Sequence, residues 1–81
     1  MSIISERIEG TIISVDIKSS NINGATYNTE SKLLTVRFNN GSIYEYVDVP
    51  WELFTKFRLA DSQGAFLNAN VKNKHAHKKV N

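Results

Sequence analysis

Aromatic and basic side chains are the residues of this chain whose types and spacing could support recognition chemistry. Tyr44 and Tyr46 are separated by one residue, and Arg37 precedes them in the same region. Aromatic rings on an open sheet face stack with unpaired bases, and a nearby cation can pair with the phosphate backbone. These three residues are therefore candidates for nucleic-acid binding, provided that they share one face of a sheet.

A second set of cations lies at the C-terminal end of the sequence. The last ten residues contain no acid and four lysines, namely Lys72, Lys74, Lys78 and Lys79. This segment is therefore +4, which leaves −2 for residues 1–71 of a chain whose net charge is +2. A basic segment adds non-specific affinity for phosphates, whereas the alternative is a solvated terminus without a ligand. We include these lysines among the nucleic-acid-binding candidates and expect residues 74–81 to be a flexible basic tail.

The residues needed for catalysis or metal binding are sparse. The chain has no cysteine, and its two histidines, His75 and His77, have no nearby acid, so they cannot complete a tetrahedral metal site within the tail. No serine lies in a nucleophile elbow, and no glycine-rich run could hold a phosphate. We therefore expect no catalytic residues, no metal site and no cofactor, in a protein that is not an enzyme.

Two strands joined by a tight turn must position the tyrosines. Lys32–Phe38 alternates as a strand does, with Leu34, Val36 and Phe38 on one face. Asn39-Asn40-Gly41 is the strongest turn signal in the sequence, and Ser42–Val47 returns as the partner strand.

The number of residues in that loop decides which face of the sheet carries the tyrosines. A two-residue loop, Asn40-Gly41, places both tyrosines beside Arg37 and puts Glu45 among the apolar side chains. A three-residue loop with Gly41 in a left-handed bulge places the tyrosines on the apolar face and Glu45 beside Arg37. Burying an unpaired carboxylate costs several kcal/mol, whereas a tyrosine buries its ring readily when its hydroxyl finds a partner. The three-residue loop is therefore favoured, with the tyrosines as walls of the core.

Helices are expected after the hairpin. Val49-Pro50 ends the second strand and begins a helix, because proline suits the first helical turn. The apolar stripe of this helix should pack on the sheet and comprises Trp51, Leu53, Phe54 and Phe57. Asp61-Ser62 can cap a second short helix or turn over Gln63–Val71.

Strands are expected before the hairpin. Ile22–Tyr27 indicates a short strand, and Ile13, Val15 and Ile17 alternate with polar residues as in an edge strand that follows a loose N-terminus. The predicted fold is a single α+β domain, an antiparallel β-meander of three to four strands with one or two C-terminal helices packed on one face. The sequence has no apolar run of membrane-spanning length, and we expect a cytoplasmic protein.

Several short motifs occur along the chain, namely Ser19-Ser20-Asn21-Ile22, Phe38 with Asn40-Gly41, Tyr44-Glu45-Tyr46, Val49-Pro50, Ser62-x-Gly64, and Phe66 with Asn68. Their order and spacing resemble those of the KTSC family, a small domain that is named for its place at the C-terminus of some lysyl-tRNA synthetases and also occurs alone in bacteria or phages. The resemblance covers residues 19–73, with residues 1–18 as an N-terminal extension that holds the edge strand. The resemblance to this family suggests RNA binding as the role of the chain. The chain departs from the family at Ala65, where many members have a basic residue.

Two functional hypotheses follow. The first is a small non-catalytic module that binds RNA or other nucleic acid through the basic tail and a sheet surface. The alternative is a protein-interaction module, of a kind that a phage could encode, that docks a host or viral protein, because the sequence is rich in aromatic residues for its length. Neither hypothesis involves a membrane, and the sequence gives no oligomeric state.

Overall fold

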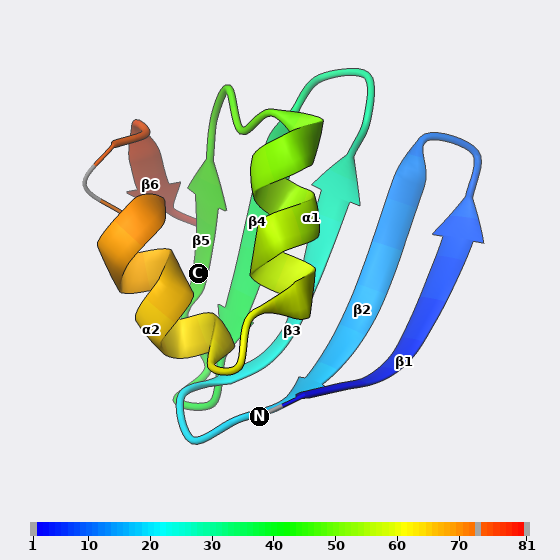
Figure 1. Ribbon diagram of the computed structural model, residues 1–81. Coiled ribbons are helices and arrows are strands. Elements are labelled where there is room, and N and C mark those ends of the chain that lie inside the picture. The colour runs from blue at the N-terminus through cyan, green and yellow to red at the C-terminus, as the bar shows by residue number, and fades with distance from the viewer. Residues whose placement is uncertain (1, 73, 81) are drawn as a thin grey trace.

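The computed structural model describes the backbone of residues 2–72 and 74–80, with side chains from Ser5 onward (Figure 1). The domain boundary that the sequence predicts at residue 73 lies outside the described residues. Within the described residues, six strands form one antiparallel sheet in chain order. The strands are β1 (Ser2–Glu9), β2 (Ile12–Lys18), β3 (Ile22–Asn28), β4 (Leu33–Phe38), β5 (Ile43–Tyr46) and β6 (His77–Lys79). The two helices are α1 (Trp51–Leu59) and α2 (Gln63–Asn70).

Both helices cover the same face of the sheet (Figure 1). The helix α1 lies over the middle strands and α2 lies beside the end formed by β5 and β6, so β1 at the opposite edge extends beyond the helical layer (Figure 1). None of the helices in the described part of the chain is long and apolar enough to cross a membrane. The α+β class and the position of the helices agree with the sequence prediction.

The prediction of three to four strands is wrong, because a strand was missed at each edge of the sheet. The loose N-terminus is β1, which pairs with Ile12–Lys18 and makes that predicted edge strand an internal one. Residues 77–79, in the segment predicted to be a flexible tail, form β6 and pair with β5. The described side chains of both edge strands, residues 5–9 and 77–79, are exposed, so this part of the sequence lacks the apolar alternation that marks a half-buried strand.

The hairpin has the register of the three-residue loop. Leu34 pairs with Tyr46 and Val36 with Tyr44, whereas Glu45 pairs with Thr35 on the other face. The amide of Phe38 donates to the carbonyl oxygen of Ser42 at 2.9 Å. Gly41 has φ +94°, a conformation that a side chain would strain. The tyrosines therefore belong to the helix-covered face, as the cost of burying Glu45 indicated.

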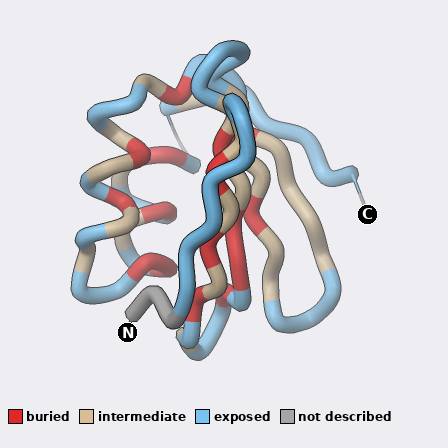
Figure 2. Tube along the Cα trace, turned by 90° about the vertical axis from the view of Figure 1, so that its right-hand side faces the viewer, coloured by how far each residue is buried: buried red, intermediate tan, exposed pale blue. Residues whose placement is uncertain are grey.

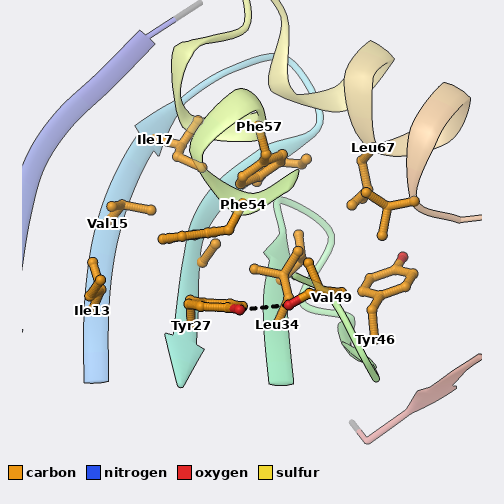
Figure 3. Packing of buried hydrophobic residues seen from close by; sticks show 14 residues of the cluster. Ile13, Val15, Ile17, Tyr27, Leu34, Tyr46, Val49, Phe54, Phe57 and Leu67 are labelled. Atoms are coloured by element: carbon orange, nitrogen blue, oxygen red, sulfur yellow. Dashed lines mark hydrogen bonds between the residues drawn. The ribbon is translucent and has the colours of Figure 1, made fainter. Parts of the chain in front are cut away.

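The core lies between the sheet and the helices (Figures 2 and 3). Side chains from β2 to β5 meet Phe54, Phe57 and Leu67 of the helices; from β2 these are Ile13, Val15 and Ile17, as predicted. Of the predicted helical stripe, Phe54 and Phe57 are fully buried, but Trp51 is 44% exposed. The expectation that Trp51 lies in the core is therefore corrected: it sits at the rim, with its ring against Tyr27 and Phe54.

The connection between the helices is fixed by hydrogen bonds. The Ser62 hydroxyl accepts from the amide of Ala65 at 3.2 Å and so caps α2, as predicted. The buried side-chain amide of Gln63 donates to the carbonyl oxygen of Ala60 at 3.0 Å. This bond satisfies an acceptor that the end of α1 leaves free, and it fixes where α2 starts.

Candidate functional site

A groove runs between the β5–β6 end of the sheet and α2. Its volume is about 280 Å³. Its lining comes from β4, the hairpin turn, β5, α2, the segment after α2, and β6. The residues are Phe38, Asn40, Ser42, Tyr44, Tyr46, Asn68, Lys72 and His77. The groove therefore brings together members of the predicted lysine and tyrosine sets, which lie far apart in the sequence.

The two tyrosines have different roles in this groove. Tyr46 is only 2% exposed, and in Figure 3 Leu67 points from α2 toward it. Burial raises the pKa of Tyr46 above its usual value, which disfavours the ionised phenolate at this position. Tyr44 is half-buried and packs edge-on against Phe38, with ring centroids 5.6 Å apart. Tyr44 and Phe38 thus offer aromatic surface to a ligand, whereas Tyr46 forms the floor.

The strand β6 brings basic groups to the same face. Tyr46 pairs with His77 and Tyr44 pairs with Lys79, and directly paired residues point to the same side of a sheet. The ring of His77 lies 5.3 Å from that of Tyr46 and 6.0 Å from that of Tyr44. Lys79 is therefore placed on the groove side, although it does not line the groove itself.

The segment after α2 supplies a further cation. Val71 is fully buried and anchors this segment in the core. The amide of Lys72 donates to the carbonyl oxygen of Leu67 at 2.8 Å, which closes the helix and leaves the exposed Lys72 side chain at the groove. Lys74, also exposed, lies in the turn that leads to β6 and is not part of the lining.

Arg37 and Lys78 lie on the opposite, helix-free face of the sheet. Lys78 pairs with Glu45, which itself pairs with Thr35. The guanidinium of Arg37 donates to the Thr26 hydroxyl at 3.3 Å. A Cβ at Gly24 would collide with the Arg37 guanidinium, so the absence of a side chain there makes room for it. The structure therefore does not bring Arg37 together with the tyrosines.

A polar cluster on that helix-free face is centred on Asp16. Its carboxylate accepts a 2.6 Å hydrogen bond from the Ser5 hydroxyl and lies 3.4 Å from Arg7 and 3.9 Å from Arg37. The Ser5 hydrogen bond, followed by the charges of the two arginines, lowers the pKa of Asp16 below its usual value. These groups are paired with one another and so tie β1, β2 and β4 together.

The charge of the groove is one-sided. Its eight lining residues include one lysine and one histidine but no aspartate or glutamate. Within the part of the chain that the structure describes, no three histidine, cysteine or acidic side chains gather as a metal site would need. The Nδ1 atom of His75 donates to the carbonyl oxygen of Val47 at 3.1 Å. This hydrogen bond links the segment that precedes β6 to the residue that follows β5.

Several groove residues were not among the candidates from the sequence. Phe38 and Asn40 were assigned to the strand and the turn of the hairpin, and Asn68 only to a motif. All three belong to the motifs of the KTSC resemblance, and this was the signal that could have identified them. Ser42 and His77 carried no such signal, because His77 reaches the groove only through the pairing of β6 with β5. Composition and periodicity do not reveal that pairing.

Comparisons with known proteins agree with the motif interpretation. The KTSC domain family matches residues 18–75. A protein from Tsukamurella paurometabola is 39% identical over 56 residues, which is 69% of this chain and 84% of that protein. The crystal structure of a KTSC domain protein from Yersinia pestis superposes with a TM-score of 0.79 at 27% identity. That likeness covers 86% of this chain and 99% of the Yersinia chain.

Proposed function

The chain belongs to the KTSC family, and from this premise we propose that it is a small non-catalytic module that binds single-stranded nucleic acid, RNA foremost, in the groove beside β6. One observation carries the proposal. An accessible aromatic pair, Phe38 and Tyr44, lies in a groove that is lined by the cation of Lys72 and by no acidic residue. Bases and phosphates require these two kinds of surface side by side.

The shape of the groove agrees with a strand of nucleic acid better than with an enclosed metabolite. Pockets for drug-sized ligands usually have volumes of roughly 300–1,000 Å³ and bury most of the ligand. This groove has about 280 Å³, just below that range, and is partly open to solvent. A base stacked on Tyr44 would leave its sugar and phosphates outside, where Lys72 and Lys79 are placed to meet them.

Polar groups at the rim add a means of reading bases. Asn40, Ser42 and Asn68 line the groove from the hairpin turn and from α2. The Asn40 side-chain oxygen already accepts from the amide of Ser42 at 2.9 Å, so the group that this side chain can offer a ligand is its NH₂ donor. Single-stranded bases expose the edges that such side chains can bond.

The test is a titration of a short fluorescent oligouridine with the full chain. Binding is measured by fluorescence anisotropy at about 50 mM and at about 200 mM salt. Affinity should fall between the two salt concentrations, because binding to phosphates releases counterions. A Lys79→Gln variant should bind more weakly and lower the slope of log affinity against log salt by about 0.7, the value for one phosphate contact on a single strand.

Lys78→Gln is the matched control. Lys78 is adjacent in sequence and also exposed, but its pairing with Glu45 places it on the opposite face. It should leave affinity and salt slope nearly unchanged. Equal losses in the two variants would mean that only net charge matters and that the groove has no role. An absence of binding by the unaltered chain would reject the proposal.

Exposed apolar residues on α1 favour a second candidate, a protein-interaction module. Trp51 is 44% exposed and Leu59 is 79% exposed. Large exposed aromatic and aliphatic side chains are common at protein interfaces. Affinity purification after nuclease treatment should then recover a protein that a Trp51→Ala, Leu59→Ser variant loses, and recovery of nucleic acid alone would count against this candidate.

A further inference from the structure

We propose that the groove beside β6 continues into a second subsite, a pocket at the hairpin turn that holds the base of the adjoining nucleotide. This inference rests on the proposed function and extends it from one nucleotide to two. The second subsite, called the turn pocket, has a volume of about 270 Å³. It is lined by Ser20, Asn21, Phe38, Asn39 and Asn40. Phe38 and Asn40 also line the groove beside β6, so the groove and the pocket share a wall.

Two turns that are distant in the sequence form the turn pocket. The turn between β2 and β3 lies beside the turn between β4 and β5 (Figure 1). The backbone amide of Asn39 donates to the carbonyl oxygen of Asn21 at 2.8 Å. The side-chain amide of Asn39 donates to the carbonyl oxygen of Ser19 at 2.9 Å. Hydrogen bonds therefore join the walls of the pocket before any ligand binds, as in most sites for small ligands.

The first turn of α2 makes room for the side chain of Asn21. Gly64 is buried there, and a Cβ at this position would lie 3.2 Å from the side-chain nitrogen of Asn21. A side chain on residue 64 would therefore push Asn21 away from the helix. The motif that begins at Ser19 and the motif Ser62-x-Gly64 meet at this contact. The lining of the groove beside β6 includes no residue of either motif, so the turn pocket gives both of them a place in the site.

The lining of the turn pocket is neutral, whereas the groove beside β6 has a lysine. Its five residues carry four polar side chains and one aromatic ring but no charge. The side-chain nitrogen of Asn39 is held by Ser19, which leaves its side-chain oxygen to accept from a ligand. Asn40, the next residue, offers a donor. Phosphate binding relies on cations, whereas an unpaired base presents donors and acceptors on its edges and an apolar face. The turn pocket therefore suits a base.

Neighbouring nucleotides of one strand occupy the groove and the pocket in order. The first base stacks on Tyr44 in the groove beside β6. Phe38 lines both the groove and the pocket, so its ring lies between the first base and the second. The strand then runs from β6 across Phe38 toward the turn between β2 and β3. A ligand with one base fills only the groove, whereas a dinucleotide fills the groove and the turn pocket.

Ligands that differ by a single base test the second subsite. The dinucleotide UpU is compared with two analogues in which an abasic ribose replaces one uridine or the other, so that the phosphate and the length of the ligand stay the same. Binding is measured by nuclear magnetic resonance titration of the isotope-labelled full chain. UpU should bind at least about fivefold more tightly than either analogue, because the second base adds hydrogen bonds and ring contacts. The amide signals of Ser20 and Asn21 should shift with UpU and much less with the analogues.

Two variants should remove the advantage of the second base by different routes. Asn21→Ala deletes a side chain of the turn pocket, and Gly64→Ala displaces that side chain with its Cβ. In each variant UpU should bind within about twofold of the analogues, while the analogues bind as they do to the unaltered chain. Gly64→Ala should stay folded, because alanine is the better helix former and the exposed Asn21 can turn away. The melting temperature of each variant is measured beside its affinity.

Asn23→Ala is the matched control. Asn23 is also an exposed asparagine, two residues along the chain, and it lines neither the groove beside β6 nor the turn pocket. This variant should keep the full advantage of UpU over its analogues. Equal binding of UpU and the analogues to the unaltered chain, or equal losses in Asn21→Ala and Asn23→Ala, would overturn the second subsite while oligouridine binding in the groove beside β6 still stands. A chain that binds neither UpU nor a longer oligouridine would reject both proposals.

Discussion

The hydroxyl of Tyr27 donates a hydrogen bond of 2.6 Å to the backbone carbonyl oxygen of Val49 (Figure 3). Both residues are almost fully buried, and the ring of Tyr27 stacks on Phe54 with centroids 4.4 Å apart. The amide of Val49 donates to the carbonyl oxygen of Lys32 at 3.0 Å. Two hydrogen bonds, one from β3 and one to the turn before β4, therefore fix the segment that leads into α1, and with it the position of the helix over the core.

Tyr27→Phe should destabilise the protein by about 1–3 kcal/mol, because it leaves the buried carbonyl oxygen of Val49 without this donor while the ring remains. Urea unfolding followed by circular dichroism would measure the change. Tyr44→Phe is the control, since the Tyr44 ring is half-buried at the groove, and it should change stability by less than about 0.5 kcal/mol. Equal stability of the Tyr27→Phe variant and the unaltered protein would contradict the role given to this hydrogen bond.

The stability of the protein in acid should depend on Asp16. Its pKa is lowered in the folded state, first by the Ser5 hydrogen bond and then by Arg7 and Arg37. The ionised carboxylate therefore favours folding; its contribution is complete above the unfolded-state pKa of about 3.9 and is lost as the pH falls through the lower folded-state pKa. The difference in melting temperature between the unaltered protein and Asp16→Asn should be constant at neutral pH and shrink in that acid range. A difference in melting temperature that did not change with pH would disprove this contribution of Asp16 to stability.

Gly41 fixes the loop of the hairpin and hence the face on which the tyrosines lie. Its φ is +94°, and a Cβ added there would meet no atom within 4 Å, so the cost of a side chain is backbone strain rather than collision. Gly41→Val should destabilise the protein by about 1–2 kcal/mol. Gly41→Asn should cost less, because asparagine tolerates positive φ better than branched residues do. Thermal unfolding of both variants measures this, and equal losses would argue against strain as the cause.

The middle of the chain could be predicted from its sequence because local and tertiary preferences agree there. The turn residues Asn39-Asn40-Gly41, the alternation around Leu34 and Val36, and the cost of burying Glu45 all favour one register, which the structure has. Pro50 and the spacing of Phe54 and Phe57 likewise define α1. Consistency among such levels is what makes a segment predictable.

The edges of the sheet could not be predicted in the same way. In β1, Glu6 and Arg7 interrupt the apolar pattern, and only the tertiary partners Arg58 and Asp16 explain why charges occur there. In β6 every residue is exposed, so its formation depends on backbone pairing with β5. Of the candidate residues from the sequence, Tyr44, Tyr46 and Lys72 line one groove, whereas Arg37 and Lys78 lie on the other face of the sheet.

Stacking on Tyr44 should account for much of the affinity for a single strand. Removing an aromatic platform costs roughly 1–3 kcal/mol per stacked base, so Tyr44→Ala should weaken oligouridine binding by about 5- to 150-fold. Tyr44→Phe keeps the ring and should bind within about threefold of the unaltered protein. Because Phe38 packs edge-on against Tyr44, the melting temperature of each variant must be measured beside its affinity. If Tyr44→Ala stays folded and binds as tightly as Tyr44→Phe, the aromatic surface of the groove does not hold the base.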